Sequence, residues 1–552
     1  MAKRILTLCI VALIGLALFA GCNRGDEEGA WGGRHDLPDE ERWFGRFDDT
    51  VTVRLAYPSN AAHEWQPGDS PSDNLWTREF YERFNIQVEI MWEAVHAGGD
   101  YETRLNLAIA SGDVPDFIRF DNATQFANMQ QAGQLFDMSW YFERFAYPLV
   151  QELMNADGIA MTWGRVGDGL YGIPTDGVSL GSPRMLYMRR DWFEATGLPM
   201  PTTIEEFWHT TETMARQNNA FVTAVSRSII RNGMSDIQGP SNAFGAFPTQ
   251  WVDDGQGGLV YGSLDMRVRT VLERYAQWFA EGLLDPGFSA LDGGAMGEQL
   301  TTSRIAGMSS MVWLSGWPLA GAWGTEHWTE WIMLPILPSE TLQTPLMVTA
   351  DAGAASRLVS IREGFRYPEA FFKMWNFATA MLEDQERGQQ EIFHPRFMDN
   401  PFTYFPDPMQ NPTTHRNLTA LINGTPIDQV PMREHCRGRW FYFERYFAGE
   451  MPETDTIWGH WVNWIGDYSG WGILTNYMDR GQLFVCRTMG LQTDSMVAHW
   501  ADLTDLESVF FIEVMSGQRP ITDFENYFIP TWHAMGGTQI TAEVNEWWAA
   551  RN

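Results

Sequence analysis

Positive charge is scarce in this chain of 552 residues. Lysine and arginine together number 38 against 70 aspartate and glutamate residues, which gives a formal net charge of −32 at pH 7. After the first few residues the only lysine is Lys373, so arginine carries almost all of the positive charge. Nucleic acids and anionic membrane surfaces both attract clustered basic side chains. We therefore expect neither of them to be a partner of this protein.

Sequence motifs for metal binding and catalysis are missing as well. The four cysteines include no CxxC pair, and the eleven histidines form no HExxH motif, so we expect no metal site and no cofactor. A match to the GxSxG nucleophile elbow, around Ser179, lies between Pro174 and Pro183 instead of between a strand and a helix. We expect no catalytic residue, although spacing alone does not reveal a pair of glycosidase carboxylates.

Only one long apolar run is present, and it begins the chain. Lys3 and Arg4 precede an apolar stretch from Ile5 to Ala20, with no basic stop-transfer flank behind it, which is typical of a secretory signal. The sequence LFAGC at 18–22 resembles the bacterial lipobox, which implies that Cys22 is lipidated. We predict an exported lipoprotein held by its lipid at the cell surface or the periplasmic face; an ordinary secreted protein is the alternative.

Two further cysteines, Cys436 and Cys486, lie in the later part of the chain. An exported compartment permits a disulfide, and closing a loop of this length would contribute about 4 kcal/mol in the chain-entropy description. The sequence leaves a bridge between them and two buried thiols equally open.

Aromatic residues are abundant, at 14% of the chain with 26 tryptophans. Most of them belong in a core. However, an indole also stacks on the apolar face of a sugar ring while carboxylates and amides bond the hydroxyl groups. The run WGHWVNWIGDYSGWG at 458–472 spaces its tryptophans at i, i+3 and i+6, which fits a buried helical face or a stacking surface containing Trp461.

Strand and helix patterns alternate in the first part of the chain. Residues 51–57 and 86–93 predict strands, residues 74–85 predict a helix between them, and residues 101–121 predict a helix followed by a short strand. This order favours a parallel sheet covered by helices. Residues 386–500 show few clean periods, and we predict long loops with short elements there.

Several stretches, in order, resemble extracellular solute-binding proteins of ABC importers (family 1), nearest to the large lipoprotein branch that binds oligosaccharides. They are DGLYGIPTDGVSLGSPRMLYMRRDWFEATGLPMPTTIEEFW at 168–208, RYAQWFAEGLLDPGF at 274–288, SRIAGMSSMVWLSGW at 303–317 and FIEVMSGQRPITDFENYFIPTWHAMGGTQITAEVNEWW at 511–548.

The resemblance implies a two-lobed α/β fold of the periplasmic-binding-protein type (type II), whose hinged lobes close over a ligand cleft. YGIP at 171–174 would be the first crossing between the lobes, WIMLPILP at 331–338 the second, and a third would follow the helix at 368–384. The expected division is a signal peptide at 1–21, a lipidated tether at 22–48, lobe 1 at 49–171 and 335–388, and lobe 2 at 172–334 and 389–552, with the loop-rich insertion at about 386–500.

The expected ligand-binding residues follow strands or lie near crossings. They are Asn60, Asp121, Asn122, Trp313, Trp317, Asp351 and Trp461. Trp313 and Trp317 fall where relatives such as maltose-binding proteins place a stacking tryptophan. Core packing of Trp313 and a satisfied strand-end carboxylate at Asp121 remain open alternatives.

The sequence thus predicts a monomeric, non-catalytic, lipid-anchored receptor for a small carbohydrate. Such a receptor would deliver its ligand to the transmembrane subunits of an ABC permease. The open alternatives are a receptor for peptides or other polar solutes, a receptor that serves a signalling partner, and a surface glycoside hydrolase or lyase.

Overall fold

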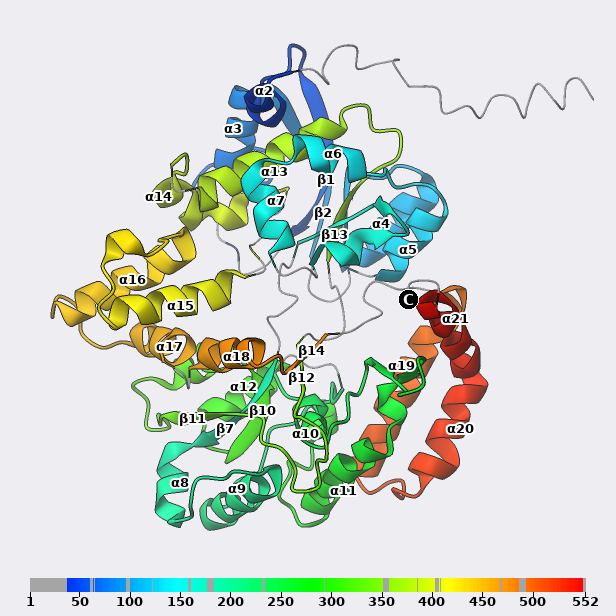
Figure 1. The fold of residues 1–552 in the computed structure, drawn as a ribbon, viewed down its shortest axis with the longest axis vertical. Helices are drawn as coiled ribbons and strands as arrows, with labels where there is room; N and C mark the ends of the chain where they lie inside the picture. Colours follow the sequence, from blue (N-terminus) through cyan, green and yellow to red (C-terminus); the bar gives the residue numbers. More distant parts are fainter. Residues whose placement is uncertain are drawn as a thin grey trace, which may run out of the picture.

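The computed structural model describes most of the chain after the N-terminal segment. The described residues are 37–549 apart from 60–62, 64, 96–99, 122, 157–159, 176–182, 231–233, 292, 351–356, 385, 403–406, 408, 467–468 and 486–492. Figure 1 shows two lobes, the upper one containing the first sheet and the lower one containing the second sheet and the C-terminal helices.

The first lobe is built on a five-stranded sheet in the order β2-β1-β3-β13-β6. Its strands are β1 (Val51–Ser59), β2 (Ile86–Val95), β3 (Phe117–Phe120), β6 (Ile173–Pro174) and β13 (Leu358–Ile361). The first three are parallel, as the β-α-β pattern predicts, whereas β13 is antiparallel to both β3 and β6. A strand from late in the chain therefore completes the sheet.

Helices of the first lobe include those predicted at 74–85, within 101–121 and at 368–384, and others that were not predicted. The helices are α2 (Asp39–Phe44), α3 (Leu75–Phe84), α4 (Asp100–Ser111), α5 (Ala123–Gln131), α6 (Ser139–Phe145), α7 (Pro148–Asn155), α13 (Pro368–Glu383) and α14 (Gln390–Phe393). At the start of α3 the Asn74 side chain accepts hydrogen bonds from the N–H groups of Trp76 and Thr77, which satisfies two of the unpaired donors of the first turn. Helix α13 is buried along its whole length and lies at the centre of this lobe (Figure 1).

The second lobe contains a three-stranded antiparallel sheet in the order β10-β7-β11. Its strands are β7 (Arg184–Arg189), β10 (Gly307–Met311) and β11 (Trp331–Pro335). The strand pairs β4 (Arg165–Val166) with β5 (Gly169–Leu170), β8 (Trp251–Asp253) with β9 (Leu259–Tyr261), and β12 (Val348–Thr349) with β14 (Leu483–Phe484) lie outside the two main sheets.

The helices of the second lobe surround one large hydrophobic core. They are α8 (Arg190–Thr196), α9 (Ile204–Asn218), α10 (Gln238–Ala243), α11 (Met266–Ala280), α12 (Gly293–Thr301), α15 (Gln410–Ile422), α16 (Glu434–Phe447), α17 (Asp455–Trp464), α18 (Gly470–Asp479), α19 (Asp494–Met515), α20 (Ile529–Trp532) and α21 (Thr538–Ala549). The core joins buried residues between 185 and 348 with others between 418 and 544.

The prediction of long loops over residues 386–500 is wrong for most of that range, because α15 to α18 are regular helices. The periodicity of α18 is weak in the sequence because this helix buries residues on several sides. In α18, seven of ten residues are buried, including both Trp471 and Leu474. A helix that packs on more than one side has no clean amphipathic stripe.

The crossings between the lobes differ in part from the expectation. The first crossing joins β6 to β7, as predicted, so YGIP ends in a strand of the first sheet. The segment 331–338 is not a crossing, because β11 pairs with β7 inside the second lobe. The chain returns later, between β12 and β13, and leaves the first core again after Phe402. Within the part of the chain that is described, no helix is both long and apolar enough to cross a membrane.

Candidate functional site

One edge of the first sheet collects the ends of strands from three distant parts of the chain. The parallel strands β1, β2 and β3 all end at this edge. The last residue of β3, Phe120, and the last residue of β6, Pro174, both pair with Leu358, the first residue of β13. Asp121, Thr175 and Arg357 therefore lie together there, and the Thr175 N–H donates to the carbonyl of Arg357 at 3.1 Å.

The second sheet has a corresponding edge. Arg184, the first residue of β7, pairs with Met311, the last residue of β10, and Met185 pairs with Pro335, the last residue of β11. The loop with Trp313 and Trp317 leaves the sheet at this edge. Because the first crossing runs from the end of β6 to the start of β7, these two edges are the ones that the chain joins, and they form the candidate site between the lobes.

Asp121 lies at the expected place, and arginines neutralise it. Its side chain is 6% exposed, and its Oδ1 lies 3.0 Å from Arg119 Nε and 3.2 Å from Arg357 Nε. A buried carboxylate requires this kind of compensation. The two arginines account for Oδ1, and a ligand contact at Asp121 stays a prediction.

Trp313 and Trp317 form a pair just beyond β10. Their ring centroids are 6.2 Å apart, with an angle of 32° between the ring planes. Trp313 is partly buried against the core of the second lobe, whereas Trp317 is 58% exposed. An exposed indole supported by a second one beneath it offers a fixed apolar surface to a ligand.

Trp461 does not join this pair. In helix α17, Gly459 and Asn463 face the loop that carries Trp313 and Trp317: a β-carbon at Gly459 would lie 3.7 Å from Gly316 Cα, and the Ser315 hydroxyl donates to the Asn463 side chain. Trp461 lies between them in sequence and therefore points to another side of the helix, where its ring contacts Phe443 and Phe447.

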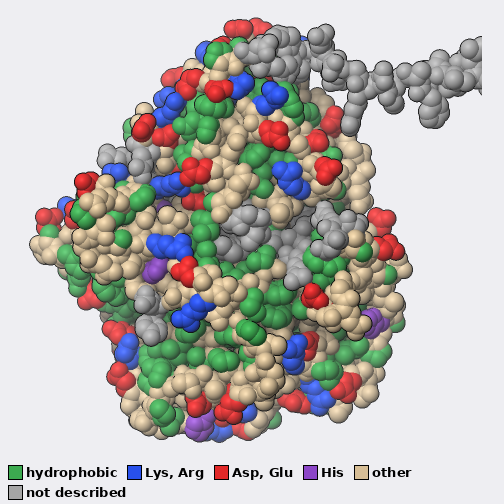
Figure 2. All heavy atoms as spheres, viewed as in Figure 1, with side chains coloured by type: hydrophobic (Ala, Val, Ile, Leu, Met, Phe, Trp, Pro, Cys, Tyr) green, Lys and Arg blue, Asp and Glu red, His purple; other side chains and the backbone are tan. Residues whose placement is uncertain are grey.

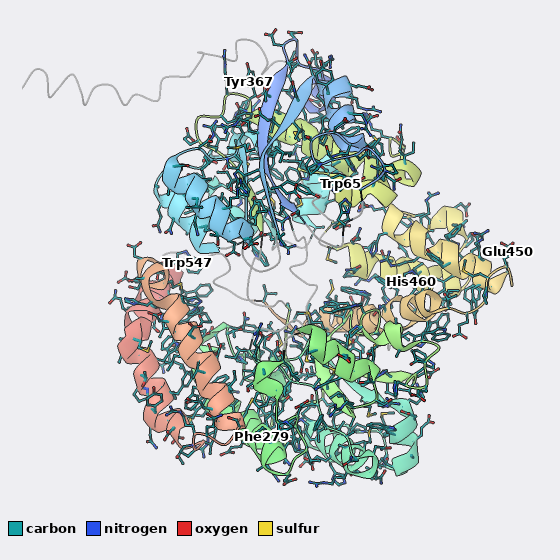
Figure 3. The ribbon with its side chains drawn as sticks, turned by 180° about the vertical axis from the view of Figure 1, so that it is seen from behind. Trp65, Phe279, Tyr367, Glu450, His460 and Trp547 are labelled. Atoms are coloured by element: carbon teal, nitrogen blue, oxygen red, sulfur yellow. The ribbon has the colours of Figure 1, made fainter. Side chains whose placement is uncertain are left out.

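An aromatic group at the end of β1 escaped the sequence analysis. Trp65 lies 5.8 Å from Tyr57 and 4.7 Å from His63 between ring centroids, and Figure 3 shows it on the side of the first lobe that faces the second. His63 Nε2 is 2.9 Å from Asp399 Oδ1. Burial, with smaller contributions from Glu93 and Asp399, raises the pKa of Tyr57 to about 12. The sequence feature that could have identified this group is a tryptophan shortly after a predicted strand.

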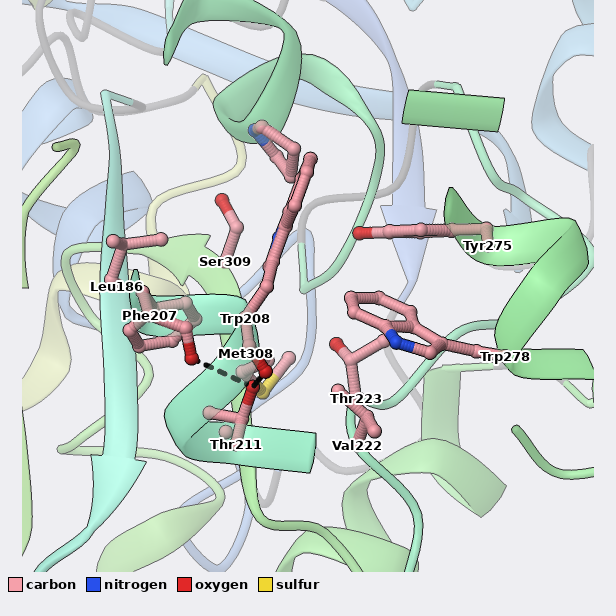
Figure 4. A pocket seen from close by; sticks show the side chains of 12 residues that line it. Leu186, Phe207, Trp208, Thr211, Val222, Thr223, Tyr275, Trp278, Met308 and Ser309 are labelled. Atoms are coloured by element: carbon pink, nitrogen blue, oxygen red, sulfur yellow. Dashed lines mark hydrogen bonds between the residues drawn. The ribbon is translucent and has the colours of Figure 1, made fainter. Parts of the chain in front are cut away.

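A pocket in the second lobe is too small to hold a ligand. It lies among residues of α9, β7, β10 and α11, with Leu186, Trp208, Trp278 and Ser309 in its wall (Figure 4). Its volume is about 10 Å³, and a cavity needs about 10–15 Å³ to hold even one water molecule. The pocket is a packing void inside the core.

The structure shows the state of one of the two later cysteines. Cys436 is a free, buried thiol, so the Cys436–Cys486 bridge is not formed and the thiol alternative is correct for Cys436. Burial raises the pKa of Cys436 to about 12. Among the described residues no group of three or more His, Cys, Asp or Glu side chains could hold a metal ion.

Several expected positions lie outside the described residues. They are Cys22, Asn60, Asn122, Asp351 and Cys486, and Ser179 of the rejected elbow motif also lies outside them.

Two α/β lobes joined by several crossings make up the fold, and solved structures of two-lobed solute-binding proteins have the same fold. The alginate-binding protein AlgQ2 is 15% identical, with 91% of this chain and 99% of that chain covered and a TM-score of 0.58.

Two further solved structures give the same result. An HMO binding solute-binding protein from Bifidobacterium longum infantis is 12% identical, with 90% and 98% covered and a TM-score of 0.61. The substrate-binding protein FusA of S. pneumoniae, solved in complex with kestose, is 15% identical, with 91% and 99% covered and a TM-score of 0.59. At these identities the likeness establishes the two-lobed fold and nothing finer.

Part of the chain also matches a family model. Residues 76–281 match the model of the bacterial extracellular solute-binding proteins, which confirms the resemblance noted above. Lipoprotein LipO of Bacillus subtilis is 25% identical over 142 residues, which are 25% of this chain and 26% of LipO. The match thus spans about a quarter of that curated relative.

Proposed function

We propose that this protein is the receptor of an ABC importer and that it binds an oligosaccharide between its lobes. The observation that carries the proposal is the tryptophan pair beyond β10, with the 58% exposed Trp317 resting against Trp313 at the edge that the crossings join to the first lobe. Trp65 lies at the opposite edge. The sugars named for AlgQ2 and FusA agree with such a ligand.

Binding would follow from ordinary chemistry of these groups. The indole of Trp317 covers the apolar C–H face of a sugar ring, and polar side chains at the strand ends bond its hydroxyls. Closure of the hinge excludes water from the ligand and makes these hydrogen bonds stronger. No covalent bond forms or breaks, so release needs only reopening of the lobes.

The N-terminal sequence supports a receptor that stays beside its transporter. A lipid on Cys22 would hold a monomeric receptor at the membrane and raise its concentration around the permease. The ligand would then pass to the transmembrane subunits without diffusing away.

Isothermal titration against a panel of oligosaccharides tests the proposal. We expect one class to bind, and we expect Trp317→Ala to weaken that binding by about 10- to 100-fold, because about 1.5–3 kcal/mol of aromatic burial is lost. Trp140→Ala is the matched control, because Trp140 is an exposed tryptophan on α6 of the other lobe.

The same titration separates the alternatives. If no sugar of the panel binds and short peptides do bind, the carbohydrate assignment is wrong. Turnover of a polysaccharide that stops when one carboxylate is neutralised would instead make the protein a glycoside hydrolase or lyase.

A further inference from the structure

A groove runs along the second lobe between helix α17 and strand β11, and we call it the β11 groove. It consists of two adjoining pockets of about 480 Å³ and 550 Å³ that share Arg190, Trp331, Trp461 and Val462 in their walls. Each volume is within the range of about 300–1,000 Å³ found for ligand sites. The two pockets together leave room for more than one sugar ring.

The groove lies apart from the candidate site between the lobes. In Figure 1, β11 is at the outer side of its sheet with α17 above it, and in the same view Figure 2 shows hydrophobic side chains gathered over this part of the surface. Gly459 and Asn463 of α17 face the loop of Trp313 and Trp317, so α17 separates that loop from the groove.

One wall of the groove is an unpaired strand edge. The Arg190 N–H donates to Glu330 O at 3.0 Å, and the Arg189 N–H donates to Ala306 O at 3.0 Å. Hydrogen bonds alternate along an antiparallel pair, so Ile332 and Leu334 are bonded to β7. The N–H and C=O groups of Trp331 and Met333 point the other way, where no described strand pairs with β11.

The other wall is aromatic. Residues of α16 and α17 supply rings around the first pocket: Tyr446, Phe447, Trp458 and Trp461. Two of these rings are open to solvent, since Trp461 is 41% and Phe447 is 53% exposed. The two rings also meet at a ring-plane angle of 75°, so they form a corner and not a flat hydrophobic patch.

Charged groups stand at the rim. Arg190 Nε lies 2.7 Å from Glu330 Oε2, and Glu453 is a further carboxylate of the first pocket. Carboxylates thus outnumber the single arginine, and the arginine is already paired. This balance disfavours an anionic ligand.

We propose that the β11 groove is a second carbohydrate site, which takes a neutral oligosaccharide. A sugar hydroxyl both donates and accepts hydrogen bonds. The N–H and C=O groups of Trp331 and Met333 match that need, the carboxylates at the rim accept further hydroxyl protons, and Trp461 supplies a ring face. The site does not depend on the one proposed between the lobes.

A peptide strand fits the same groove less well. Adding a strand to an edge requires a ladder of main-chain hydrogen bonds. Strand β11 has five residues, and its last residue is Pro335, which has no N–H group. Only Trp331 and Met333 remain as outward donors, and two donors do not make a ladder.

Hydrogen exchange with the full chain tests the inference, using malto-, cello-, xylo- and manno-oligosaccharides, an oligogalacturonate, and a lysine-flanked valine–threonine peptide as probes. We expect one neutral oligosaccharide to protect the amides of Trp331 and Met333. Trp461→Ala and Phe447→Ala should each weaken that protection at least about tenfold, whereas Trp140→Ala and Trp317→Ala should leave it unchanged.

The other outcomes would overturn the inference. Protection by the peptide or the oligogalacturonate alone would assign the groove to a different ligand. Protection that Trp317→Ala abolishes would mean a single site between the lobes. If no probe protects these amides while titration still detects sugar binding that depends on Trp317, the groove is not a site and the proposed function stands.

Discussion

Arg184 and Asp236 form a buried ion pair close to the point where the chain enters the second lobe. Both side chains are at most 1% exposed, and Arg184 Nε donates to Asp236 Oδ1 at 3.1 Å. Burial raises the pKa of Asp236, and the Arg184 guanidinium offsets part of that rise. Asp236 also accepts a hydrogen bond from the Gln238 N–H at the start of α10. The pair therefore ties the first residue of β7 to a neighbouring helix.

We predict that Arg184→Met destabilises the protein by about 3–5 kcal/mol, because it leaves the Asp236 carboxylate buried without its cationic partner. The double variant Arg184→Met/Asp236→Asn should recover part of this loss, since it removes the charge and keeps the acceptor for Gln238. Denaturant unfolding measures both. A double variant as unstable as the single one would show that the unpaired charge is not the cause.

For individual residues, the sequence predicted the position along a strand or helix better than the contacts that the side chain makes. Asp121 lies where the strand pattern placed it, but its main neighbours include Arg357, which is far along the chain. Trp461 was expected on a buried helical face or a stacking surface; it lies in α17, and the side of the helix that it occupies depends on how α17 packs against residues 313–322. A local pattern contains no information about such partners.

At the scale of elements, the C-terminal helices are held together by a carboxylate at a helix start. Glu543 of α21 accepts hydrogen bonds from the Ser495 hydroxyl at 2.6 Å and from the Ser495 N–H at 3.2 Å, in the first turn of α19. Burial raises the pKa of Glu543, but hydrogen bonds from Ser495, Thr493 and Gln539 outweigh it and lower the pKa to about 2. The charged carboxylate thus favours docking of α21 on α19.

The sign of the pH dependence follows from this lowered pKa. The unfolded carboxyl titrates near its ordinary value of 4.5. Its contribution to stability is present above pH 4.5 and is lost as the pH falls to about 2, because the unfolded state binds the proton first. We predict that Glu543→Gln lowers stability at pH 7 by at most about 1 kcal/mol, given the solvent screening of this partly exposed group.

Thermal unfolding at pH 7 and at pH 3 measures this effect. The difference between the wild type and Glu543→Gln should shrink at the lower pH. Gln539→Ala is a milder companion variant, since Gln539 donates to the same carboxylate at 3.1 Å. A difference that stays constant between the two pH values would contradict the assignment.

Across the described part of the molecule, no hydrophobic cluster joins the two lobes: two clusters lie in the first lobe and one lies in the second. Buried residues from 47 to 173 and from 359 to 402 form the first core, and residues from 185 to 348 and from 418 to 544 form the second. Separate cores allow the lobes to move as bodies, and a few crossing residues absorb the change.

We predict that the oligosaccharide bound between the lobes reduces the radius of gyration. Small-angle X-ray scattering with and without the sugar measures the radius of gyration. At the same sugar concentration, Trp317→Ala should keep the larger radius of the open form. A sugar that binds with full affinity and leaves the scattering curve unchanged would contradict closure of the lobes.

We also predict that Cys22→Ala releases the protein from the membrane, because the lipid has no other attachment point in the lipobox. Fractionation of cells into membrane and soluble parts measures the change. Cys436→Ala is the matched control, because Cys436 is a buried thiol within the second core. Retention of Cys22→Ala in the membrane fraction would show that another feature holds the protein there.

The sequence by itself was sufficient to predict the first strands, the capped helices and the segments that resemble the family. The signals for these elements are burial with a period of two or 3.6 residues and N-cap chemistry, which act over a few residues. Only the tertiary structure decided the rest. It inserted β13 into the first sheet beside β3, formed helices α15 to α18, with α18 buried on several sides, and turned Trp461 toward β11 instead of Trp317. These outcomes depend on partners distant in the chain, whose contacts supply the free energy that local propensity lacks.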